Sequence, residues 1–250
     1  MKKSLRFILT ICASLVLIAG FGTPANAAQP PPGYPSHEIM ATAQHATLGP
    51  IPIHRGFYDG DVDQGFGMDK AYHKHNIWTL SAMKKVMVSP NYFMGGNGNY
   101  NLTAYAGHYE CESTPGVCVL SDQRELRGVH DGRSYQTYYN WPVNGLMGQL
   151  TLYCINPGGA RLCPNWVTFA IDNPGVSNPF QPGTMKSEVE PSPTATLGAS
   201  KPESSDDSER INKKLSELES QQLLTELSEG TTALEFSYEP LPQTIKNPNK

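Results

Sequence analysis

Reactive side chains are concentrated in one short stretch of this chain, residues 65–75, which reads Gly-Phe-Gly-Met-Asp-Lys-Ala-Tyr-His-Lys-His. The stretch holds two of the seven histidines, and His, Lys and Asp are side chains that move protons or bind phosphate near neutral pH. In a helix, Asp69 and His73 share one face and Lys70 and Lys74 share another, because residues four apart are neighbours. A carboxylate fixes the tautomer of an adjacent imidazole, and two ammonium groups can hold a phosphate.

These groups suit metal-independent cleavage of an RNA phosphodiester. A base removes the proton of the 2′-hydroxyl, an acid protonates the leaving oxygen, and a cation stabilises the phosphorane. The alternative is an amphipathic helix whose polar side chains only face solvent. The candidate catalytic residues of this stretch are His75, Lys70, His73 and Asp69. Two histidines on or near expected strands, His108 and His130, are candidates for a second catalytic histidine.

Two stretches contain residue types that bind metal ions. His73 and His75 face one side only in an extended chain, whereas on a helix they point about 200° apart, so we expect no metal and no cofactor there. Residues 59–63 alternate carboxylates like the start of a calcium loop, but Gln64 and Lys70 occupy positions that an EF-hand gives to Gly and Glu. A polar turn is the preferred interpretation of residues 59–63, and calcium binding is the second.

Other parts of the chain exclude several enzyme classes. No nucleophile elbow, P-loop, dinucleotide fingerprint or HExxH motif is present. Acidic residues slightly outnumber basic ones, 23 against 19, and this composition does not indicate a broad nucleic-acid surface.

An aromatic cluster can stack on single-stranded bases, but aromatic residues are also ordinary strand residues. The cluster is Tyr135, Tyr138, Tyr139 and Trp141.

The N-terminus has the features of an export signal. Basic residues precede an apolar run over Phe7–Ile18, and an Ala-Asn-Ala cleavage motif ends at Ala27. The run is shorter than the roughly 20 residues of a membrane span. The sequence therefore predicts a secreted bacterial protein with no stable membrane insertion after cleavage of residues 1–27.

Four cysteines follow the signal: Cys111, Cys118, Cys154 and Cys163. They allow three disulfide connectivities. Each neighbouring pair brackets turn residues, so local pairing of the first two and of the last two is the simplest choice. A zinc site is the alternative, but the spacings are wider than those typical of zinc ligands, and an exported protein is oxidised.

Composition divides the remaining chain into five parts. Residues 28–50 are expected to form a flexible leader, and 51–175 a compact domain. Pro, Ser, Thr and Glu dominate 176–207, so a disordered linker is expected there. Residues 208–229 suit an amphipathic helix, either transient or docked, and 230–250 a disordered tail.

Within the domain, helical patterns precede strand patterns. Residues 66–75 and 79–88 fit short helices, and Asp131-Gly132 favours a hairpin turn. The expected fold class is α+β, with one or two N-terminal helices packed on a four-stranded antiparallel meander stapled by two local disulfides. The four expected strands are Tyr100–Cys111, Val117–Val129, Ser134–Trp141 and Gly148–Ile155.

Two motifs carry a family resemblance. The stretch 65–75 has the form Gly-Phe-Gly-x-x-Lys and ends in Lys-His, and residues 148–153 read Gly-x-Leu-Thr-x-Tyr. Together they resemble the small secreted toxin ribonucleases of the barnase–EndoU–colicin–RelE type. The resemblance implies metal-independent cleavage of RNA, with His75 and Lys70 as catalytic residues and Thr151 near the scissile phosphate. It also implies an immunity protein as a partner.

This chain departs from such toxins in its disulfides, its near-neutral domain and its acidic tail. The alternatives are therefore a separate secreted actinobacterial family, and a non-enzymatic exported protein that binds a surface or a protein partner and also binds calcium.

Overall fold

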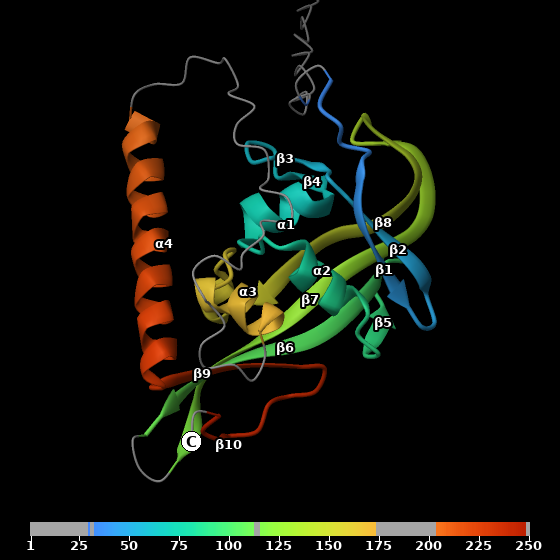
Figure 1. Cartoon of the computed structure of the whole chain (residues 1–250). Coiled ribbons are helices and arrows are strands. Elements are labelled where there is room, and N and C mark those ends of the chain that lie inside the picture. Colours follow the sequence, from blue (N-terminus) through green and yellow to red (C-terminus); the bar gives the residue numbers. More distant parts are fainter. Residues whose placement is uncertain (1–29, 31–32, 113–115, 174–203, 249–250) are drawn as a thin grey trace, which may run out of the picture.

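A computed structural model defines the fold (Figure 1). The predicted signal peptide and most of the predicted linker lie outside the described residues. The structure describes residue 30 and residues 33–112, 116–173 and 204–248. In the range 204–248, side chains are described from residue 217 onward.

One antiparallel sheet organises the molecule, and this agrees with the α+β class. Its three long strands, β6 (Tyr100–Cys111), β7 (Val117–Tyr138) and β8 (Trp141–Ile155), follow one another in sequence. β7 pairs with both β6 and β8. Two short strands, β5 (Tyr92–Met94) and β9 (Thr232–Ser237), pair with β6.

The expected four-stranded meander is wrong because the turn lies elsewhere. Asp131 and Gly132 remain inside β7, where the register against β8 shifts. The reversal occurs at Tyr139 and Asn140, with φ of 52° and 65°, which are the left-handed angles that a tight two-residue hairpin turn requires. The expected third strand is therefore mainly the end of β7.

Four strands precede the helices, so the helices are not N-terminal in the fold. β1 (Ile39–His45) and β2 (Gly49–His54) form an antiparallel hairpin. β3 (Phe57–Asp59) and β4 (Gln64–Phe66) form a second. The expectation of a flexible leader is wrong over residues 39–50, because these residues belong to the first hairpin, in which Ala43, His45 and residues 51–54 are buried.

Three short helices cover one face of the sheet (Figure 1). The helix patterns over 66–75 and 79–88 correspond to α1 (Gly67–His75) and α2 (Leu80–Met87). The hydroxyl of Thr79 caps α2 by accepting the Ala82 N–H at 3.1 Å. α3 (Asn165–Asp172) follows a 3₁₀ turn at Pro157–Gly159.

The C-terminal part is ordered where a disordered tail was expected. α4 (Ser204–Glu229) buries Leu223 and Leu227 against the core formed by α3 and the sheet. β9 then pairs with β6, and β10 (Thr244–Lys246) pairs with β7. The prediction of disorder is therefore wrong over 232–246.

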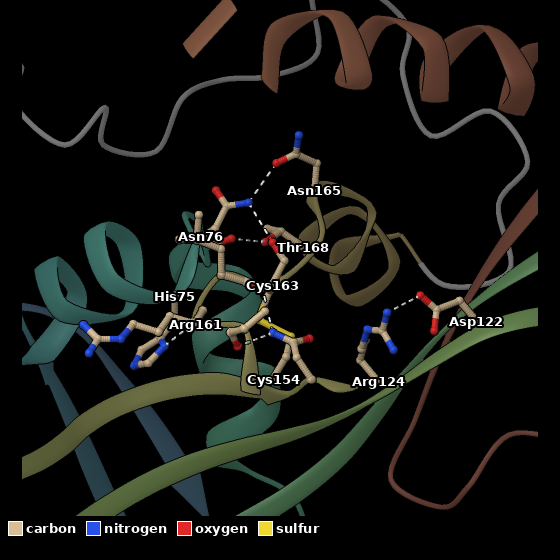
Figure 2. The surroundings of a disulfide bond; sticks show 12 residues. His75, Asn76, Asp122, Arg124, Cys154, Arg161, Cys163, Asn165 and Thr168 are labelled. Atoms are coloured by element: carbon tan, nitrogen blue, oxygen red, sulfur yellow. Dashed lines mark hydrogen bonds and ion pairs between the residues drawn. A yellow bond between two sulfur atoms is a disulfide. The ribbon is translucent and has the colours of Figure 1, made fainter. Parts of the chain in front are cut away.

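Both local disulfides are present. Cys111 and Cys118 are directly opposite on β6 and β7, and Cys154 of β8 is joined to Cys163 before α3 (Figure 2). The pairing is compatible with an oxidising environment outside the cell. Among the described residues, no helix has the length and apolar character needed to cross a membrane.

Candidate functional site

His75, the last residue of α1, lies beside β8. Its side chain is buried, and its ring lies 5.4 Å from the ring of Tyr153, measured between centroids. The Nδ1 atom lies 3.1 Å from the carbonyl oxygen of Arg161 (Figure 2). A carbonyl only accepts hydrogen bonds, so Nδ1 carries the proton and Nε2 carries the lone pair. This tautomer gives His75 a basic nitrogen at Nε2.

The Cys154–Cys163 disulfide positions this histidine. The bond holds the loop that carries Arg161 against β8, and the Cys163 N–H donates to the carbonyl of His75 at 3.0 Å. Asn76 ends α1 in the left-handed conformation, with φ of 59°. Its side-chain amide donates to the Cys163 carbonyl at 2.9 Å (Figure 2). The end of α1 and the disulfide loop therefore form one hydrogen-bonded unit.

The environment of His75 disfavours its charged form. Burial is the main cause and lowers the pKa of His75 to about 4, and the nearby charges of Lys74 and Lys70 add to the effect. His75 is therefore neutral at pH 7. A bound anion would act in the opposite direction and raise its pKa, because an opposite charge favours the protonated form.

Lys70 and Lys74 have different surroundings. Lys74 forms an ion pair with Asp63 at 2.6 Å, which lowers the pKa of Asp63. The Lys70 ammonium instead donates to the carbonyl of Gly65 at 3.1 Å. Burial, followed by repulsion from Lys74, lowers the pKa of Lys70. Within the described part of the chain, Lys70 has no carboxylate within ion-pair distance, so its charge is available to an anion.

The predicted pairing of Asp69 with His73 is not found. Asp69 is buried and accepts a hydrogen bond from the hydroxyl of Tyr34. Burial raises the pKa of Asp69 to about 6, against the lowering effects of the Tyr34 hydrogen bond and the charge of Arg55. His73 is exposed and lies edge-on to Tyr72, with 4.6 Å between ring centroids. Asp69 thus fixes the N-terminal segment rather than orienting an imidazole.

Thr151 and Tyr153 lie on the same face of β8, because side chains two residues apart point the same way. Thr151 is 8% exposed, and its hydroxyl oxygen is buried without a hydrogen-bond partner. The two residues are roughly 7 Å apart along the strand. A buried hydroxyl without a partner is costly, so this group is suited to accept or donate a bond to a ligand.

His108 and His130 do not join this site. His130 is buried, with Nδ1 3.1 Å from the carbonyl of Gly148 and its ring stacked on Tyr100. The Nδ1 atom of His108 lies 2.8 Å from the Ser121 hydroxyl. None of their hydrogen bonds or ring contacts is with α1, so we assign neither a catalytic role.

Asp59 ends β3, and residues 60–63 form the turn that leads into β4. A carboxylate oxygen of Asp59 accepts the N–H of Asp61 at 2.9 Å, and Asp63 binds Lys74 and the hydroxyl of Tyr58. Among the residues that the structure describes, no group of three or more His, Cys, Asp or Glu is placed to hold a metal ion.

The aromatic cluster of the sequence is mainly structural. Trp141 is completely buried and packs edge-on to Phe57. Tyr138 contacts Phe66 and Tyr135, and the more exposed Tyr139 forms part of the turn. These rings contact one another and therefore stabilise the β7–β8 hairpin.

The sequence did not identify Tyr153 and Arg161 as site residues. The alternation of Gln-Leu-Thr-Leu-Tyr over 149–153 is a signal that places Tyr153 beside Thr151. No local signal exists for Arg161, because its carbonyl reaches His75 only through the disulfide loop.

Comparisons of the chain with protein-family models, curated proteins and solved structures gave no match. The resemblance to toxin ribonucleases therefore rests on the motifs at 65–75 and 148–153 alone.

Proposed function

We propose that this protein is an exported, toxin-type ribonuclease that cleaves RNA without a metal and uses His75 as general base. The observation that carries the proposal is the neutral His75 ring, which has its lone pair on Nε2, lies next to Tyr153 and is near enough to the unpaired charge of Lys70 for that charge to lower its pKa. A neutral imidazole and a cation are the two groups that transesterification of RNA requires.

In the proposed reaction, Nε2 of His75 removes the proton from the 2′-hydroxyl, and the 2′-oxygen attacks phosphorus. The bond from phosphorus to the 5′-oxygen breaks, and the leaving oxygen takes a proton from the Lys70 ammonium. The products are a 2′,3′-cyclic phosphate and a free 5′-hydroxyl. The lowered pKa of Lys70 favours its donation of a proton, and the hydroxyl of Thr151 supplies a bond to a phosphate oxygen.

The test is cleavage of a labelled single-stranded RNA by the oxidised protein in the presence of EDTA. His75→Ala should lower the rate at least a hundredfold, as expected for loss of a general base, and Lys70→Ala should also lower it. His73→Ala is the matched control, because His73 lies on the same helix but is exposed, and it should retain activity. Absence of cleavage by the wild-type protein, or equal activity of His75→Ala, would refute the proposal.

A non-enzymatic binding protein is the second candidate. Two residues expected to be reactive, Asp69 and Lys74, instead make contacts that hold the fold together. Asp69 accepts a hydrogen bond from Tyr34, and Lys74 forms an ion pair with Asp63. This candidate predicts that inorganic phosphate binds beside Lys70 while RNA stays intact. Calorimetry with phosphate, alongside the cleavage assay, distinguishes the two functions.

A further inference from the structure

We infer that single-stranded RNA lies across the sheet face that is turned away from α1, α2 and α3, with Arg127 at its centre. The inference rests on the proposed function, because it specifies how the substrate reaches His75. The face is named here the open face and consists of Phe93, Tyr105, Glu125, Arg127 and Tyr153, with Thr151.

Strand register defines the open face. Gly128 of β7 faces α2, because a Cβ atom there would lie 2.7 Å from the side chain of Met87. Its neighbour Arg127 therefore points to the opposite face. Arg127 is directly opposite Tyr153 of β8, so Tyr153 shares the open face.

The remaining members follow from the same register. Glu125, two residues from Arg127, is directly opposite Tyr105 of β6. The guanidinium of Arg127 lies over the ring of Phe93 on β5, 5.4 Å from its centroid. Arg127 thus contacts or adjoins aromatic residues of three other strands, and this arrangement places one cation among three rings.

Phe93, Arg127 and Glu125 are partly exposed on this face, whereas Thr151 is buried. Phe93 is 47% exposed, and the side chains of Arg127 and Glu125 are 26% and 31% exposed. The residues that alternate with them, such as Leu126, are completely buried against the helices. The sheet therefore has one face in the core and one face that carries partly exposed aromatic and charged groups.

The open face has defined limits. Residues 238–243, which connect β9 to β10, cross it at one end, where the Leu241 N–H donates to the Gln123 side chain at 2.8 Å. At the outer edge of β8, Tyr153 contacts His75. Two strands, β6 and β7, lie between Phe93 on β5 and this edge on β8, so three strand spacings give a span of roughly 14 Å. A strand of RNA that follows the open face from Phe93 therefore reaches the candidate catalytic histidine.

Two polar atoms on this face lack hydrogen-bond partners. The Nε atom of Arg127 and the hydroxyl of Thr151 are both buried and unpaired. The Nη2 atom of Arg127 binds Glu125 at 2.5 Å. A phosphate would satisfy the free Nε–H and compete with Glu125 for the guanidinium, since guanidinium groups bind phosphate with two parallel hydrogen bonds.

Single-stranded RNA fits this chemistry better than a duplex does. Aromatic rings stack on any unpaired base, whereas the bases of a duplex are already stacked on each other. The alternation of Phe93, Arg127 and Tyr153 across the sheet matches the alternation of bases and phosphates in an extended strand. Glu125 lowers the affinity, because its carboxylate occupies the arginine and repels phosphate.

The test is fluorescence anisotropy with a 2′-deoxy oligonucleotide, which cannot undergo 2′-hydroxyl attack. Phe93→Ala and Arg127→Ala should each weaken binding roughly tenfold, in the range seen when one stacking or cationic contact is removed. Glu125→Gln should strengthen binding. Met94→Ala and Lys84→Ala are the matched controls, because these exposed residues lie outside the open face, and they should bind as the wild type does.

A second measurement separates this inference from the proposed function. Inorganic phosphate should bind wild type and Phe93→Ala equally, because it needs only the His75 site, whereas the oligonucleotide should discriminate between them. The predicted pattern of oligonucleotide affinities without any RNA cleavage would remove the proposed function and support the open face as a binding surface. Equal oligonucleotide affinity for all variants, each with a wild-type circular dichroism spectrum, would overturn the inference even if RNA is cleaved.

Discussion

Two buried titratable groups at opposite ends of α1 affect stability in opposite directions. The pKa of His75 falls from 6.5 to about 4 on folding, so the unfolded chain binds an extra proton between these values. Stability therefore falls as pH drops through this window. The pKa of Asp69 rises from 3.8 to about 6, so the folded chain binds the extra proton and stability rises as pH drops through nearly the same window.

The first prediction follows from this opposition. Asp69→Asn should leave His75 uncompensated, so its free energy of unfolding should fall by up to about 2 kcal/mol between pH 6 and 4.5. His75→Gln should show the opposite change over the same interval. Urea denaturation at the two pH values measures both, and parallel pH dependence in wild type and Asp69→Asn would contradict the assigned shifts.

At the scale of elements, the Cys154–Cys163 disulfide joins β8 to the end of α1. Removing it by Cys154→Ala with Cys163→Ala should cost roughly 2–4 kcal/mol of stability. The loop that carries Arg161 would also be released, so the pKa of His75 should move from about 4 towards its ordinary value of 6.5. An NMR titration of the imidazole measures this change.

The other disulfide supplies the control for this second prediction. Cys111 and Cys118 join β6 to β7 away from α1, so their replacement by Ala should also lower stability but should leave the His75 titration unchanged. If both double variants shift the titration equally, the disulfide loop does not position His75.

The elements differ in how far the sequence predicts them. α2 was predictable because its cap, Thr79, and its apolar spacing are local. The β7–β8 turn was not, because the Asp131 carboxylate binds Arg133 and Tyr135 and keeps the Asp-Gly pair within the strand. The turn forms instead at Tyr139-Asn140, a pair without the glycine that normally marks such a turn.

In the candidate site, too, the residue types were predictable from the sequence but their surroundings were not. The stretch 65–75 supplied His75 and Lys70, since reactive residue types are visible in a sequence. Their surroundings depend on contacts between distant segments: His75 with Tyr153, and Asp69 with Tyr34. Helical spacing alone therefore predicted His73 as the partner of Asp69, whereas in the folded chain its hydrogen-bond partner is Tyr34.

At the scale of the whole molecule, the C-terminal segment is part of the core. Leu227 is 1% exposed and Leu223 is 7% exposed, whereas Leu218 on the same helix is 53% exposed. Leu227→Ala should lower the free energy of unfolding by about 2–5 kcal/mol. Leu218→Ala should change it by less than about 0.5 kcal/mol. Chemical denaturation measures both, and equal small effects would mean that α4 is not docked in solution.

The pairing of β9 with β6 has a consequence for the order in which the chain is made. β6 forms the edge of the three long strands, and its residues 105–110 pair on that side with β9, which is synthesised after more than a hundred intervening residues. Until β9 arrives, this edge displays unpaired N–H and C=O groups that can recruit a strand from another molecule. A translation product that stops before residue 232 would therefore be a template for aggregation. In the full chain, β9 prevents this because it pairs with the exposed edge of β6.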